Sequence, residues 1–159
     1  MNTRNRARRI VVGVDGSPES LAALAWAVEE AGRADGEIDA VLAYDSGLAW
    51  IDVGSEYQAP ILEQSATEAK ATLHHALEGL GIEASSSVPV RPLAVEGSPA
   101  RVLVELARDA DLLVVGSRGR GGFAGVMLGS ISQRCAGHSP CPVVVVPSAP
   151  STTSEEDAR

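Results

Sequence analysis

Five runs of aliphatic and β-branched residues recur along the chain, separated by stretches in which apolar and polar residues mix. The first run, 9–15, is continuously apolar up to its turn residues, which is typical of a central strand covered on both faces of a sheet. The other runs also contain aliphatic residues, and prolines bound the last of them. We expect strands at 9–15, 38–44, 86–95, 112–115 and 142–147.

Between these runs, apolar residues return every three or four positions, which is the spacing of one face of an α-helix. This spacing predicts helices at 18–32, from 61 to about 81, from 99, and from 130. The segment 45–58 has no clear period, and we expect a loop there. Two of the helices follow a Gly-Ser-Pro turn, in which serine is a favoured N-cap and proline suits the first helical position.

Strand and helix alternate from the first element to the last, which predicts a parallel sheet with helices on both faces and right-handed crossovers. In a five-stranded parallel sheet of order 3-2-1-4-5, the order of the strands reverses between the first and the fourth strand. Ligands bind such sheets at the carboxyl ends of the strands flanking this reversal. The first candidates for a binding site are therefore residues 15–17 and 116–119.

The length of 159 residues suits one domain, placed at 9–148, between a disordered basic N-terminus (1–8) and a flexible acidic tail (149–159). The net charge of −8 argues against a nucleic-acid or membrane-surface binder. No apolar run reaches the roughly 18 residues of a membrane span, and the first run is too short for a signal peptide. A cytoplasmic location is expected. The sole lysine, Lys70, excludes a lysine-dependent phosphate loop.

Cysteine and histidine offer no evident catalytic group. Cys135 and Cys141 lack the spacing of a metal or redox pair; we expect Cys135 in the core and Cys141 just before an edge strand. His74 and His75 are adjacent on a helix and are expected at the surface. Neither a nucleophile with its base nor a pair of carboxylates stands out, and the last strand lacks the lysine of a phospho-receiver domain.

Six of the 16 glycines fall within 116–130, between the fourth strand and a helix. Glycine lets the backbone approach a ligand closely, and the free N–H groups at the start of a helix favour phosphate. The hydroxyls of Ser130 and Ser132 can add donors, while Arg118 and Arg120 supply positive charge. The segment therefore predicts a phosphate-binding loop.

The spacing Gly116-x2-Gly119-x9-Gly129-Ser130 resembles the ATP-binding pattern Gly-x2-Gly-x9-Gly-(Ser/Thr) of the universal stress protein family. The opening and closing strands also resemble those of the family, so that the resemblance covers about residues 8–148. It implies an ATP-binding member of the family, with the Rossmann-like fold of the adenine nucleotide α-hydrolases.

The resemblance also implies roles for single residues. Asp15 matches the aspartate near the ribose and any bound divalent metal, and Ala43 matches the position whose backbone meets the adenine edge. The arginines and glycines after the fourth strand are expected at the ribose and phosphates. The full set of expected contact residues is Gly13, Val14, Asp15, Ala43, Val115, Gly116, Arg118, Gly119, Arg120, Gly121, Gly122, Gly129, Ser130, Ile131 and Ser132.

We therefore expect a regulatory protein whose ATP-bound state controls binding of an unknown protein partner, with Mg²⁺ as an optional companion held mainly by the phosphates. The alternative is a slow ATPase or nucleotidyl-transferring enzyme of the same superfamily. Members of the family often dimerise through their last strand. In this chain the edge strand 142–147 is uncharged and aliphatic, which favours a homodimer through that strand.

Overall fold

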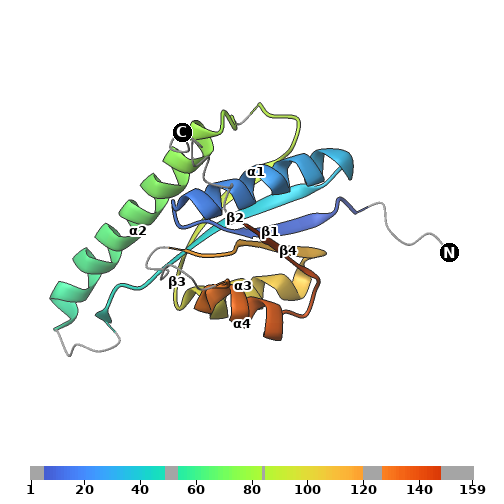
Figure 1. Ribbon diagram of the computed structural model, residues 1–159. Helices are drawn as coiled ribbons and strands as arrows, with labels where there is room; N and C mark the ends of the chain where they lie inside the picture. The colour runs from blue at the N-terminus through green and yellow to red at the C-terminus, as the bar shows by residue number, and fades with distance from the viewer. Residues whose placement is uncertain (1–5, 49–53, 84, 120–126, 148–159) are drawn as a thin grey trace, which may run out of the picture.

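The computed structural model describes residues 6–48, 54–83, 85–119 and 127–147 (Figure 1). Within these ranges strands and helices alternate as the sequence predicts. The elements are β1 (Arg9–Gly13), α1 (Pro18–Arg33), β2 (Glu37–Tyr44), α2 (Ser55–Gly79), β3 (Val90–Glu96), α3 (Pro99–Leu106), the 3₁₀ turn η2 (Ala107–Asp109), β4 (Leu112–Gly116), α4 (Ser130–His138) and β5 (Val143–Val146).

The strands are all parallel and lie in the order β3-β2-β1-β4-β5, which confirms the predicted fold class. In Figure 1, α1 and α2 cover one face of the sheet, and α3 and α4 cover the other. The neighbours β1 and β4 connect onward in opposite directions along the sheet. Their carboxyl ends therefore lead into diverging connections, and a crevice opens between them.

Each face of the sheet carries its own apolar core. Ile10 and Val12 pack with the core beneath α1 and α2, whereas Val11 packs with the core beneath α3 and α4. This alternation follows because successive side chains of a strand point to opposite faces. All three side chains are 0% exposed. Coverage on both faces is the physical reason that β1 reads as a continuous apolar run.

Residues 6–8 contact the folded body by ion pairs. A guanidinium nitrogen of Arg6 lies 3.3 Å from a carboxylate oxygen of Asp111, and Arg8 lies 3.0 Å from Glu30 on α1. The expectations for 1–5 and for the tail lie outside the described residues.

A buried carboxylate joins three elements at the amino end of the sheet. Asp39 on β2 is 3% exposed. It accepts hydrogen bonds from Arg9 at 2.8 Å and from Arg91 at 2.7 and 2.9 Å. Burial raises the pKa of Asp39, but the hydrogen bonds from Arg91 and Arg9 outweigh that effect and leave the pKa below its ordinary value. The cluster therefore holds β1, β2 and β3 together electrostatically.

Helix α2 begins at Ser55 and not at Ile61, so the predicted loop at 45–58 is wrong over its last residues. The helix continues through Pro60. The first turns are exposed, with Tyr57 63% exposed. A helical period in the sequence reflects burial on one side. Helical turns that are exposed on all sides have no apolar period in their sequence, and the sequence therefore does not predict the true start of α2.

Two other local predictions need correction. The third strand begins at Val90 and not at Ser86, because Ser86 closes a turn in which its N–H donates to the carbonyl of Glu83 at 2.9 Å. The two Gly-Ser-Pro turns also differ. Ser17 caps α1 by accepting the N–H of Ser20 at 3.3 Å, whereas Ser98 makes no side-chain cap on α3.

Candidate functional site

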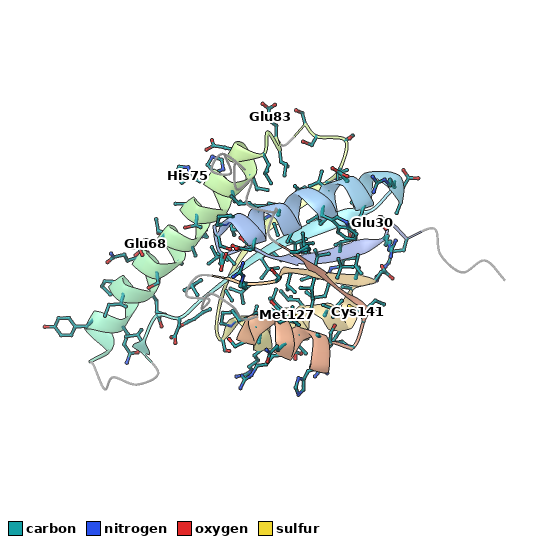
Figure 2. All side chains as sticks on the ribbon, viewed as in Figure 1. Glu30, Glu68, His75, Glu83, Met127 and Cys141 are labelled. Carbon is teal, nitrogen blue, oxygen red and sulfur yellow. The ribbon has the colours of Figure 1, made fainter. Side chains whose placement is uncertain are left out.

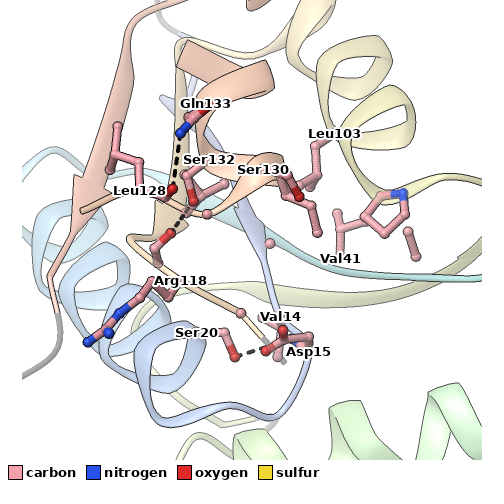
Figure 3. Close-up of a pocket in the computed structure, with 18 residues that line it drawn as sticks. Val14, Asp15, Ser20, Val41, Leu103, Arg118, Leu128, Ser130, Ser132 and Gln133 are labelled. Carbon is pink, nitrogen blue, oxygen red and sulfur yellow. Dashed lines mark hydrogen bonds between the residues drawn. The ribbon is translucent and has the colours of Figure 1, made fainter. Parts of the chain in front are cut away.

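The carboxyl ends of β1 and β4 open into a cavity of about 580 Å³ (Figure 3). Binding sites for small molecules typically enclose roughly 300–1,000 Å³. The walls come from β1, β2 and β4 and from the first turns of α1, α3 and α4. The cavity therefore lies at the reversal of strand order, where the sequence predicts a binding site.

Every predicted site residue within the described ranges lines this cavity. Arg120, Gly121 and Gly122 lie outside the described residues. The predicted residues that the fold brings together are Gly13, Val14, Asp15, Ala43, Val115, Gly116, Arg118, Gly119, Gly129, Ser130, Ile131 and Ser132.

Some lining residues were missed from the sequence. These are Ser20, Val41, Pro99, Leu103, Leu128 and Gln133. The spacing of residues along one strand and along one helix could have predicted three of these lining residues. Val41 lies two positions before Ala43, so both side chains share one face of β2. Pro99 and Leu103 are four positions apart on α3, so they share one face of that helix.

The turn after β1 fixes the Asp15 carboxylate. The N–H of Ser17 donates to Oδ1 of Asp15 at 2.9 Å, and Oγ of Ser20 accepts the N–H of Asp15 at 3.2 Å. The same Ser20 hydroxyl donates to the carbonyl of Ser17 at 3.0 Å. Gly16, with φ 83°, supplies the left-handed residue that the turn requires. The carboxylate is thereby held at the end of β1, facing the cavity.

Gly119 lies directly against this carboxylate. A Cβ added at Gly119 would stand 2.7 Å from Oδ2 of Asp15, closer than real Cβ contacts allow. The loops that follow β1 and β4 therefore meet across the strand-order reversal, and only glycine fits there without displacing the aspartate. This contact explains one glycine of the spaced pattern in steric terms.

The start of α4 presents backbone donors to the cavity. Gly129 is the N-cap, and no side chain caps this helix. The first backbone bond of the helix runs from the N–H of Gln133 to the carbonyl of Gly129, at 3.0 Å. The N–H groups of the three residues between them consequently have no acceptor inside the helix and carry the positive end of its dipole. They offer a binding site for an anion.

The cavity has a polar side and an apolar side. In Figure 3, Val41 and Leu103 lie near each other, Asp15 lies apart from them beside Ser20, and the Arg118 side chain extends away from Asp15. The apolar side combines strand β2 with helix α3, whereas the polar side combines the loops after β1 and β4. This division suits a ligand that has a flat apolar part joined to a charged part.

Cys135, His74 and His75 are not among the residues that line the cavity. Burial raises the pKa of the Cys135 thiol to about 11, so this cysteine stays protonated in the core as predicted. His74 and His75 are exposed on α2, and their ring nitrogens lie 3.1 and 3.6 Å from the carboxylate of Glu78. Figure 2 shows His75 on α2. Within the described ranges, no group of three or more His, Cys, Asp or Glu side chains could hold a metal ion. In the same ranges, no helix is both long and apolar enough to cross a membrane.

Comparison with solved structures supports the fold. The universal stress protein UspA from Lactobacillus plantarum matches with a TM-score of 0.72 and 23% identity, over 90% of this chain and 99% of that one. A universal stress protein solved in complex with cAMP is 32% identical, with a TM-score of 0.63, over 90% of this chain and 98% of that one.

Comparison of sequences gives the family. A universal stress protein of Mycolicibacterium smegmatis is 39% identical over 138 residues, which are 86% of this chain and 45% of that protein. This chain thus spans about half the length of the curated relatives that it matches. The model of the universal stress protein family matches residues 6–147. The chain belongs to the universal stress protein family.

Proposed function

We propose that the cavity binds ATP and that the nucleotide-bound state regulates the binding of a protein partner. One observation carries the proposal. The uncapped start of α4, the loop after β4 and the Asp15 carboxylate converge in one cavity that also has an apolar wall. A purine with a phosphorylated sugar combines the two kinds of surface that this cavity offers. The related protein solved with cAMP supports an adenine nucleotide as the ligand.

The two sides of the cavity would bind different parts of the nucleotide. Val41 and Leu103 offer apolar contact to a base, and the backbone near Ala43 can donate to and accept from the edge of adenine. Guanine presents the opposite polarity at that edge. The free N–H groups at the start of α4 would bind phosphate oxygens, with Arg118 adding positive charge.

The residues present fit a magnesium ion poorly unless the phosphates also bind it. Asp15 is the one carboxylate among the described lining residues, and its Oδ1 already accepts the N–H of Ser17. Mg²⁺ prefers six oxygen ligands and usually combines one or two carboxylates with phosphates and water. We therefore propose that any Mg²⁺ arrives with the triphosphate and contacts the protein through Asp15.

A regulatory role suits this lining better than rapid catalysis. The described lining residues include no histidine, cysteine or lysine, and Asp15 is their one acid. A general base paired with a positioned nucleophile is therefore lacking among them. A slow ATPase is the alternative, and turnover of ATP with and without Mg²⁺ separates the two. Hydrolysis at rates typical of enzymes, about 1 s⁻¹ or faster, would favour the alternative.

We also propose a homodimer through β5. The sheet has two edges, and they differ. On β3, Pro92 and the exposed Arg91 oppose the addition of another strand. On β5, the sequence is four valines without charge or proline. An edge of this kind can pair with a second copy of itself about a two-fold axis.

Ligand release tests the nucleotide proposal. Purified protein is denatured, and the released ligand is identified by chromatography; calorimetry then measures the affinities of ATP and cAMP. Gly119→Glu places a bulky negative group against Asp15 and is expected to weaken ATP binding by about tenfold or more. Gly79→Glu makes the same charge change where an added Cβ meets nothing within 4 Å, and it should bind like the wild type. Wild-type affinity in Gly119→Glu would mean that the site is misplaced.

A further inference from the structure

We propose that Ser132 is a positioning residue for the nucleotide site. Its hydroxyl holds the first turn of α4 against the end of β4 and so sets the direction of the free N–H groups. The sequence by itself instead predicts that this hydroxyl donates to a phosphate. The inference rests on the proposed function, because it concerns the same site.

Hydrogen bonds close the base of the loop that joins β4 to α4. Oγ of Ser132 donates to the carbonyl of Gly116 at 2.6 Å and lies 3.4 Å from the carbonyl of Ser117 (Figure 3). The N–H of Gly129 donates to the carbonyl of Ser117 at 2.7 Å. The N–H of Ser117 in turn donates to the carbonyl of Val146 at 2.8 Å, on β5. We call the bonds from Ser132 and Gly129 to Gly116 and Ser117 the clasp.

The Ser132 hydroxyl is committed to this clasp. A serine hydroxyl has one proton to donate. The short distance to the Gly116 carbonyl shows where that proton goes, and Ser132 is 3% exposed. Ser130, at the first position of the same helix, is exposed and lines the cavity. Of the two serines, Ser130 is the one whose hydroxyl can face a ligand.

The clasp matters because α4 has no side-chain cap. Among the described residues, its first turn is joined to the end of β4 by the bond from the N–H of Gly129 to Ser117 and by the bond from the Ser132 hydroxyl to Gly116, while the Gln133 side chain donates to the carbonyl of Leu128 at 3.1 Å. Backbone donors bind an anion best when they are already aimed at it, since no energy is then spent on ordering them. Loss of the Ser132 hydrogen bond allows the first turn of α4 to shift. This shift weakens the binding of the phosphate groups of the ligand.

Ser132→Ala tests this role with two measurements. In nucleotide-free protein, amide hydrogen exchange followed by NMR reports whether the N–H of Gly129 is protected. Calorimetry with ATP and with adenosine separates phosphate binding from base binding. We expect exchange at Gly129 to accelerate at least about tenfold and ATP affinity to fall about tenfold, the effect of about 1.4 kcal/mol. Adenosine affinity should change less than about twofold. Ser132→Thr keeps the hydroxyl and should restore both.

Ser139→Ala is the matched control. Ser139 lies at the other end of α4, where its hydroxyl accepts the N–H of Cys141 at 3.3 Å. This variant should leave both the exchange at Gly129 and the ratio of ATP to adenosine affinity unchanged. If Ser132→Ala does not fold, Ser132→Cys, a nearly isosteric weak donor, takes its place.

Two results would overturn the inference while leaving the proposed function intact. One is a loss of ATP affinity with unchanged exchange at Gly129 in the nucleotide-free variant, which would mean that the hydroxyl contacts the ligand directly. The other is wild-type ATP affinity in Ser132→Ala. A wild-type protein that binds neither ATP nor adenosine would instead refute the proposed function, and with it the binding role of the clasp.

Discussion

The outer edge of β5 gives the proposed homodimer a specific test in Val145→Pro. The carbonyls of Pro142 and Val146 accept N–H groups from the β4 side. In a parallel pair, alternate residues of a strand bond to the same neighbour. The N–H and carbonyl groups of Val143 and Val145 must therefore face away from β4, toward the open edge. Proline at 145 removes an outward donor without breaking a bond between β4 and β5, and proline is tolerated at such positions of edge strands.

The expected weakening follows from this geometry. Two copies of β5 paired antiparallel would exchange about four hydrogen bonds through their outward groups. Val145→Pro removes the donor from about two of these, one in each subunit. At about 1 kcal/mol per bond, the dimer loses about 2 kcal/mol, or about 30-fold in dissociation constant. The proline ring also occupies the space of the partner strand, so this value is a lower limit.

Sedimentation equilibrium over a range of protein concentrations measures the effect. Val145 packs with the core beneath α3 and α4, so side-chain loss alone could affect stability. Val145→Ala is the matched control, since it loses the side chain but keeps the N–H. Thermal unfolding should show both variants folded. A wild type that is monomeric at micromolar concentration would refute the dimer, and equal dissociation constants for the two variants would refute pairing through this edge.

Three further outcomes are expected. Asp39→Asn should lower the free energy of unfolding by about 2 kcal/mol at pH 7, because it weakens the pairing of Arg9 and Arg91. The folded-state pKa of Asp39 is lowered, so its ionised form stabilises the fold above about pH 4, and this stabilisation is lost as the pH falls further. Urea titrations at a series of pH values should therefore show the difference in free energy of unfolding between wild type and Asp39→Asn becoming smaller below about pH 4. Gly116→Ala should cost about 1–3 kcal/mol in thermal unfolding, since its Cβ would stand 2.8 Å from the backbone of Glu19, and a wild-type melting temperature would contradict this. ATP should outcompete GTP in a displacement assay, and equal binding would exclude adenine recognition by the β2 backbone.

The sequence alone determined the order of elements and predicted most of the described residues that line the candidate cavity. Burial on both faces makes a central strand apolar throughout, and burial on one face gives a helix its period, so both patterns can be read locally. The glycine spacing at 116–129 is also local, because a backbone that must approach other groups closely needs glycine at those positions. The contact of Gly119 with Asp15 agrees with that reasoning.

Only the tertiary structure decided which groups face one another across the cavity. Leu103 lies far along the chain from Val41, and nothing in either local sequence indicates that α3 and β2 form one wall. The same holds for Ser132, whose hydroxyl reads as a free donor until Gly116 is found 2.6 Å away. A hydroxyl has one proton, and its acceptor is chosen by packing between distant segments. The local sequence therefore gives the kind of chemistry present, and the fold decides how each group uses it.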